Sequence, residues 1–69
     1  MMKEKAIELK REHERNWGLW SAKQRTNFIA RCKRLASKLD PKTAEGDDAV
    51  AVVALDIIQT RSGWQIWRA

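Results

Sequence analysis

The chain has 69 residues, of which 33% are charged and 43% are hydrophobic, a balance typical of one small folded domain and not of a disordered tail. Its only cysteine is Cys32 and its only histidine is His13, which excludes an internal disulfide and a zinc site built from cysteine and histidine. The sequence has no run near the roughly 18 apolar residues of a membrane span and no signal-peptide pattern, so we expect a cytoplasmic protein.

The formal net charge of +5 is not spread evenly along the chain. Residues 23–38 hold six basic residues and no acidic one, while the remainder holds eight basic and nine acidic residues. All of the excess positive charge therefore falls on one segment, which makes that segment the first candidate for a binding surface.

Residues 2–16 are predicted to form the first helix, because apolar side chains recur there every three or four positions. This apolar seam consists of Met2, Ala6, Leu9 and His13. The other faces are charged, as on an ordinary solvated helix, and His13 is expected to pack on the seam and not to bind a metal. Glycine costs about 1 kcal/mol relative to alanine inside a helix, so we predict a break at Trp17 and Gly18. The alternative is a helix that continues to Trp20.

Residues 22–39 are predicted to form the second helix. Ser21 followed by Gln24 is a capping box, and Asp40 before Pro41 ends the helix, because proline disfavours helical geometry in the residue before it. Cys32 is expected to be a small buried hydrophobe on the apolar face. The apolar face carries Phe28, Cys32, Leu35 and Leu39, and the opposite face carries Lys23, Asn27, Arg31, Arg34 and Lys38.

Residues 48–61 are predicted to form the third helix, after a polar loop. Asp47 and Asp48 stand near its start, and Arg61 followed by Gly63 marks its end. A β-strand over residues 49–58, paired in a hairpin with residues 64–67, is the alternative, since the segment is rich in β-branched side chains. If the segment is a helix, Gly63 is its left-handed C-terminal residue and Trp64 packs on Ile58 in a Schellman-type closure.

The third segment is apolar over most of its circumference, which is more than two short neighbouring helices can easily cover. We therefore predict an all-α fold, a small three-helix domain over residues 1–69 that is completed by homodimerisation. Residues 64–67 are expected to pack back on the helices, and the four tryptophans either close the ends of the bundle or lie in an interface. The predicted interface residues are Val52, Leu55, Trp64 and Trp67.

The separation of cationic and apolar side chains on the second helix favours binding of nucleic acid, either DNA or RNA. The residues predicted to bind are Lys23, Asn27, Arg31, Arg34 and Lys38. The alternative is a regulatory or inhibitory protein that binds an acidic protein surface through the same cations and an exposed tryptophan. In size and tryptophan content the chain resembles the small accessory proteins of phages and mobile elements. We expect no enzymatic activity, no cofactor or metal, no small-molecule substrate and no membrane association, because the sequence carries no motif for any of them.

Overall fold

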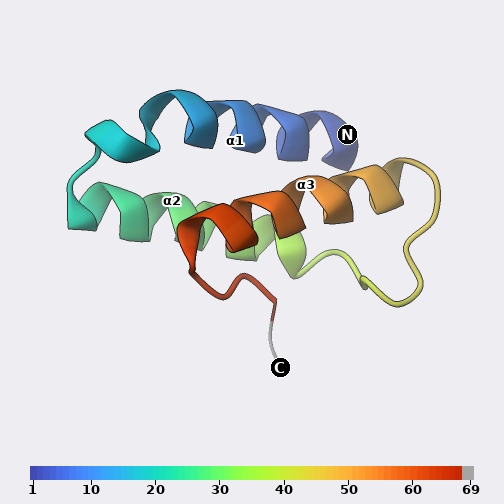
Figure 1. Cartoon of the computed structure of the whole chain (residues 1–69). Helices are drawn as coiled ribbons and strands as arrows, with labels where there is room; N and C mark the ends of the chain where they lie inside the picture. The colour runs from blue at the N-terminus through green and yellow to red at the C-terminus, as the bar shows by residue number, and fades with distance from the viewer. Residues whose placement is uncertain (68–69) are drawn as a thin grey trace.

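The computed structural model describes residues 1–67 as three helices in alternating directions, joined by a short 3-10 turn and one longer loop (Figure 1). No strand occurs among these residues, so the all-α prediction is confirmed and the strand alternative for residues 49–58 is wrong. The elements are α1 at Met2–Asn16, the 3-10 helix η1 at Trp17–Leu19, α2 at Ala22–Ala36 and α3 at Asp47–Ser62.

A break was predicted at Trp17 and Gly18, and the structure has it one residue earlier, at Asn16, with Gly18 inside a 3-10 turn. Asn16 leaves the helical region, with φ −120° and ψ −17°, and the chain tightens into η1. Trp20 is extended, with φ −85° and ψ 145°, and this residue reverses the chain direction before α2 begins. The reversal makes α2 antiparallel to α1 and brings their facing sides together (Figure 1).

The capping box at the start of α2 is present as predicted. The Gln24 N–H donates to Ser21 Oγ at 3.3 Å, and the Ser21 N–H donates to Gln24 Oε1 at 2.8 Å, which satisfies two backbone donors of the helix start. The end of α2 was predicted at residue 39 and lies at Ala36. The last turn tightens into i to i+3 bonds, such as the one from the Leu39 N–H to the Ala36 carbonyl at 3.0 Å.

Two glycines with positive φ bound α3. Gly46 precedes the helix with φ 58°, and Gly63 ends it in the left-handed region with φ 75° and ψ 5°, as predicted. The Gly63 N–H donates to the Gln59 carbonyl at 2.9 Å, whereas the Trp64 N–H donates to Ser62 Oγ at 3.2 Å. A Schellman closure needs the Trp64 N–H on a helix carbonyl, so that prediction is wrong and the turn is the simpler αL type.

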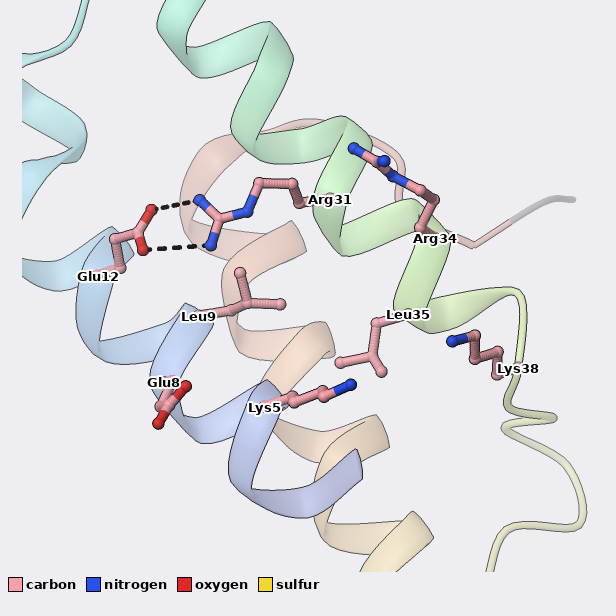
Figure 2. Close-up of a pocket in the computed structure, with 8 residues that line it drawn as sticks. All are labelled: Lys5, Glu8, Leu9, Glu12, Arg31, Arg34, Leu35 and Lys38. Carbon is pink, nitrogen blue, oxygen red and sulfur yellow. Dashed lines mark hydrogen bonds and ion pairs between the residues drawn. The ribbon is translucent and has the colours of Figure 1, made fainter. Parts of the chain in front are cut away.

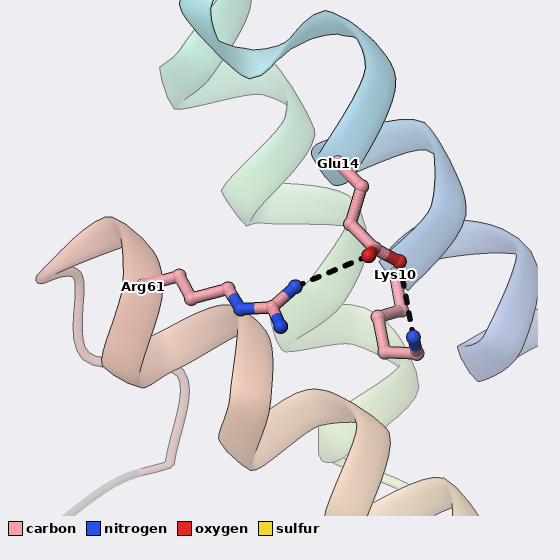
Figure 3. Close-up of polar contacts among 3 residues, drawn as sticks. All are labelled: Lys10, Glu14 and Arg61. Atoms are coloured by element: carbon pink, nitrogen blue, oxygen red, sulfur yellow. Dashed lines mark hydrogen bonds and ion pairs between the residues drawn. The ribbon is translucent and has the colours of Figure 1, made fainter.

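Parallel helices α1 and α3 form the closest packing in the fold. Small buried side chains in both helices, among them Ala6, Ala51 and Ala54, let the two backbones approach. Ion pairs mark the register at either end, from Lys3 to Asp47 at 3.6 Å and from Arg61 to Glu14 at 3.3 Å. In Figure 3 the Glu14 carboxylate accepts from Arg61 of α3 and from Lys10 of its own helix.

Helix α2 completes the core from the other side. Its buried side chains are Phe28, Ile29, Cys32, Leu35 and Ala36, and the partly buried Leu39 follows them. Cys32 is buried, as predicted for a small hydrophobe on the apolar face, and burial raises the pKa of its thiol to about 12.

The segment after α3 packs back on the helices, as predicted. Ile66 is buried in the core, and the N–H groups of Ile66 and Trp67 both donate to Gln59 Oε1, at 2.8 and 3.3 Å. The Trp67 indole N–H donates to Asp56 Oδ1 at 2.6 Å. One glutamine side chain of α3 therefore anchors the backbone of this segment.

The structure contradicts the prediction that Val52 and Leu55 of α3 lie in an interface between two copies. Val52 and Leu55, predicted to lie in an interface between copies, are 8% and 0% exposed within a single chain. Both side chains are therefore buried within one chain, and Leu55 belongs to the hydrophobic cluster that includes residues of α1 and α2. The apolar side chains that α3 does expose are Val50 and Val53, at 42% and 57%.

Candidate functional site

The five residues predicted to bind nucleic acid are all exposed or half-exposed and lie on the side of α2 turned away from the core. We call this surface the cationic face, defined as Lys23, Asn27, Arg31, Arg34 and Lys38. Lys23 and Lys38 are separated by about 22 Å along the helix direction, at 1.5 Å per residue. The cationic face is thus long enough to meet several phosphates of a nucleic-acid backbone.

Arg31 is held by a structural contact that the sequence did not reveal. Its guanidinium makes two contacts with the Glu12 carboxylate of α1, at 2.8 and 3.4 Å, and lies 5.8 Å from the centre of the Phe28 ring. The two partners are 19 positions apart, so no local spacing rule links them. Arg31 ties α1 to α2, and its charge is already neutralised.

Arg25, a cation of residues 23–38 that lies outside the cationic face, also has a structural partner. Its Nε donates to the Trp17 carbonyl at 2.9 Å, and its guanidinium lies 4.7 Å from the centre of the Trp17 ring. These contacts hold η1 against α2. Within residues 1–67, Lys23, Arg34 and Lys38 are the cations of the cationic face without an ion pair.

A shallow groove of about 330 Å³ borders the cationic face, between α1 and α2 (Figure 2). Leu9 and Leu35 form its apolar part, and the Arg31 to Glu12 pair lies at one side. Sequence reasoning missed the contribution of α1, because only the antiparallel packing of α1 on α2 brings its residues to this surface. The groove is lined by Lys5, Glu8, Leu9, Glu12, Arg31, Arg34, Leu35 and Lys38.

An aromatic cluster covers one end of the bundle, opposite the end where the long loop joins α2 to α3. Trp17 lies at its centre, stacked on His13 at 4.7 Å between ring centroids and edge-on to Trp64 at 6.5 Å. Trp20 contacts Phe28 at 5.0 Å. Leu19 is 84% exposed and Trp64 is 37% exposed at this end, so the cluster combines a structural part with an apolar surface.

His13 is buried among these rings, as the sequence predicted, and is 5% exposed. Its Nε2 has no hydrogen-bond partner among the described residues. Burial lowers the pKa of the imidazole below its ordinary 6.5, with Arg61 and Arg25 acting in the same direction and Glu14 opposing them. The folded chain therefore favours the neutral ring, which stacks on Trp17 without a buried charge.

We expect His13 to make stability depend on pH. The unfolded chain binds the proton near pH 6.5 while the folded chain resists it, so stability is full above about pH 6.5 and declines as the pH falls toward the folded-state pKa. Thermal unfolding between about pH 7.5 and pH 5 measures this decline. His13→Phe, which keeps a stacking ring, should flatten it, and an unchanged slope in that variant would assign the effect elsewhere.

A second titration is separable from that of His13. The hydrogen bond from Lys10, together with Arg61, holds the pKa of the Glu14 carboxyl below its ordinary 4.5. A carboxyl group with a lowered pKa contributes stability that is lost as the pH falls from its ordinary pKa to its folded-state pKa. The contribution of Glu14 is therefore lost below about pH 4.5, outside the pH range used for His13.

These features define a small all-α chain with a cationic face, a bordering groove and an aromatic end. Comparisons with family models, with curated proteins and with solved structures found no match to this chain. Within residues 1–67, no cluster of three or more histidine, cysteine, aspartate or glutamate side chains is placed to hold a metal ion. None of the helices described is long and apolar enough to cross a bilayer. The surfaces of the chain itself are therefore the guide to its function.

Proposed function

We propose that this chain is a small nucleic-acid-binding module that contacts the phosphates of DNA or RNA through its cationic face. The observation that carries this proposal is a row of three exposed cations without an ion pair among the described residues, Lys23 and Arg34 on α2 and Lys38 just beyond its end. Cations in such a row neutralise successive phosphates and release condensed counterions, which is the main source of affinity for nucleic acid.

Asn27 lies on the same face between these cations and is exposed. A side-chain amide can donate and accept together at an adenine edge, so Asn27 is the residue of this face suited to contact a base while the cations contact the backbone. The module acts by binding alone, in the cytoplasm, where the buried thiol of Cys32 stays reduced.

The triple variant Lys23→Gln, Arg34→Gln and Lys38→Gln tests the proposal. It should remain folded, because these side chains point away from the core and make no ion pair in the described structure. We expect weaker binding to generic duplex and single-stranded oligonucleotides. The log-log salt slope should fall by about 0.9 for each duplex phosphate that is no longer neutralised, or about 0.7 for single strands. Fluorescence anisotropy titrations between about 50 and 200 mM salt measure both quantities.

A matched control removes the same charge elsewhere, through Arg11→Gln, Arg15→Gln and Lys42→Gln at exposed positions outside the cationic face. If both triple variants bind equally weakly, affinity depends on the net charge of the chain and not on a site at the cationic face. No binding by the unmodified chain at about 50 mM salt would overturn the nucleic-acid proposal. The alternative is then an acidic protein partner that binds the same cations together with the exposed Leu19 and Trp64.

We also propose that two copies associate through the exposed apolar line of α3. Val50, Val53 and the half-buried Ile57 recur on the outer side of the helix, and Val53, Ile57 and Arg61 line a shallow hollow there. Sedimentation at high micromolar concentration should give twice the mass of 8.0 kDa, and Val53→Glu should give the monomer. A monomer at all concentrations in the unmodified chain would refute this association.

A further inference from the structure

Two lysines from different helices converge on the groove between α1 and α2. Lys5 of α1 and Lys38, just beyond α2, both line the groove, and in Figure 2 their ammonium groups point toward each other over Leu35. Neither forms an ion pair among the described residues. Two like charges that approach in this way repel each other unless an anion lies between them.

The carboxylates that line the groove do not supply that anion. Glu12 is occupied by Arg31, whose guanidinium binds both of its oxygens. Glu8 also lines the groove, but in Figure 2 its carboxylate points away from the two ammonium groups. With Arg34 on the same rim, the groove keeps an excess of positive charge after its acidic residues are counted.

The shape of the groove limits the size of the anion. Its volume of about 330 Å³ is that of a small ligand site, and the buried side chains of Leu9 and Leu35 form its apolar part. A tetrahedral dianion or a phosphodiester presents oxygens in several directions and is thus able to accept from ammonium groups on both walls at once. A carboxylate has two oxygens in one plane and suits this arrangement less well.

We propose that the groove is a binding site for one phosphate group, held between Lys5 and Lys38 with Arg34 at the rim. This inference rests on the proposed function, since a nucleic-acid strand on the cationic face would place a backbone phosphate there. It adds Lys5, which lies on α1 outside the segment that carries the excess charge. A free phosphate or a phosphorylated small molecule offers the same chemistry from a second source.

The experiment is an amide NMR titration of the full chain with inorganic phosphate, with sodium chloride adjusted to hold the ionic strength constant. Saturable shifts are expected at Leu9 and Leu35. Lys5→Gln should weaken the apparent affinity about tenfold, the effect of removing one charge-assisted hydrogen bond. Arg11→Gln is the control, because Arg11 is an exposed cation of α1 that neither lines the groove nor belongs to the cationic face.

Parallel titrations with a short single-stranded oligonucleotide distinguish this site from the general proposal. A lower oligonucleotide affinity in Lys5→Gln supports the site with nucleic acid as the source. Saturable phosphate shifts without any oligonucleotide binding support the site with a free or small-molecule phosphate, while the proposed function fails. Phosphate shifts that do not saturate, or that are equal in Lys5→Gln and the unmodified chain, would overturn the site. Oligonucleotide binding that Lys5→Gln leaves unchanged, beside phosphate shifts that it weakens, supports the site with a free or small-molecule phosphate as the source.

Discussion

Leu55→Glu is expected to unfold the chain. Leu55 is 0% exposed and packs in the core formed by all three helices, so the introduced carboxylate would be buried without a partner. Removing the apolar side chain and burying a charge together cost about 4 kcal/mol or more, and a domain of this size has about 3 to 5 kcal/mol of net stability. Far-UV circular dichroism of the purified variant should show disappearance of helix at every protein concentration.

Val53→Glu is the matched control, since it places the same charge on the same helix two positions away. Val53 is 57% exposed, so its carboxylate would remain in water and the helix content should be unchanged. The two variants also distinguish a core position from an interface position. Only Val53→Glu is expected to change the mass measured by sedimentation from dimer to monomer while the chain stays folded. A folded Leu55→Glu variant would show that Leu55 lies at a surface, in contradiction to the described packing.

Gln59→Leu is expected to release the segment after α3. Gln59 Oε1 accepts hydrogen bonds from the Ile66 and Trp67 N–H groups, and leucine of similar size offers no acceptor. Two partly buried donors left without a partner lower the free energy of unfolding by about 2 kcal/mol in total. Hydrogen exchange measured by NMR should show the largest decrease in protection at the Ile66 amide, ahead of amides within α1 and α2.

Gln59→Glu provides the conservative comparison, because glutamate keeps an oxygen in the same place to accept from both N–H groups. Protection of the Ile66 amide should largely return in this variant at neutral pH. An equal decrease in the two variants would mean that the hydrogen bonds of Gln59 do not hold the segment. In that case the burial of Ile66 and the Trp67 to Asp56 bond would be the main anchors.

The two predictions concern neighbouring turns of α3 and have different physical origins. The side chain of Leu55 acts through burial, which depends on all three helices being assembled. Gln59 acts through a pair of directional bonds to a segment that has no regular secondary structure of its own. The first variant therefore changes the global equilibrium, and the second changes a local one.

Local spacing in the sequence was enough to place the helices and most of their ends. Capping of α2 by Ser21 and Gln24, the break after Asn16 and the left-handed Gly63 all depend on contacts within four or five positions. Such contacts follow from short spacings, so they can be predicted without knowing the fold. The exposure of the cationic face follows for the same reason, since the opposite side of α2 is apolar.

Which of these surfaces are free depends instead on the packing of the helices against one another. The pairing of Arg31 with Glu12, the approach of Lys5 to Lys38 and the burial of Leu55 each depend on how α1 and α3 pack, across separations that no helical period encodes. Local spacing fixes the direction of a side chain relative to its own helix. Its partners are fixed by the other helices, because packing of apolar faces sets the positions of those helices.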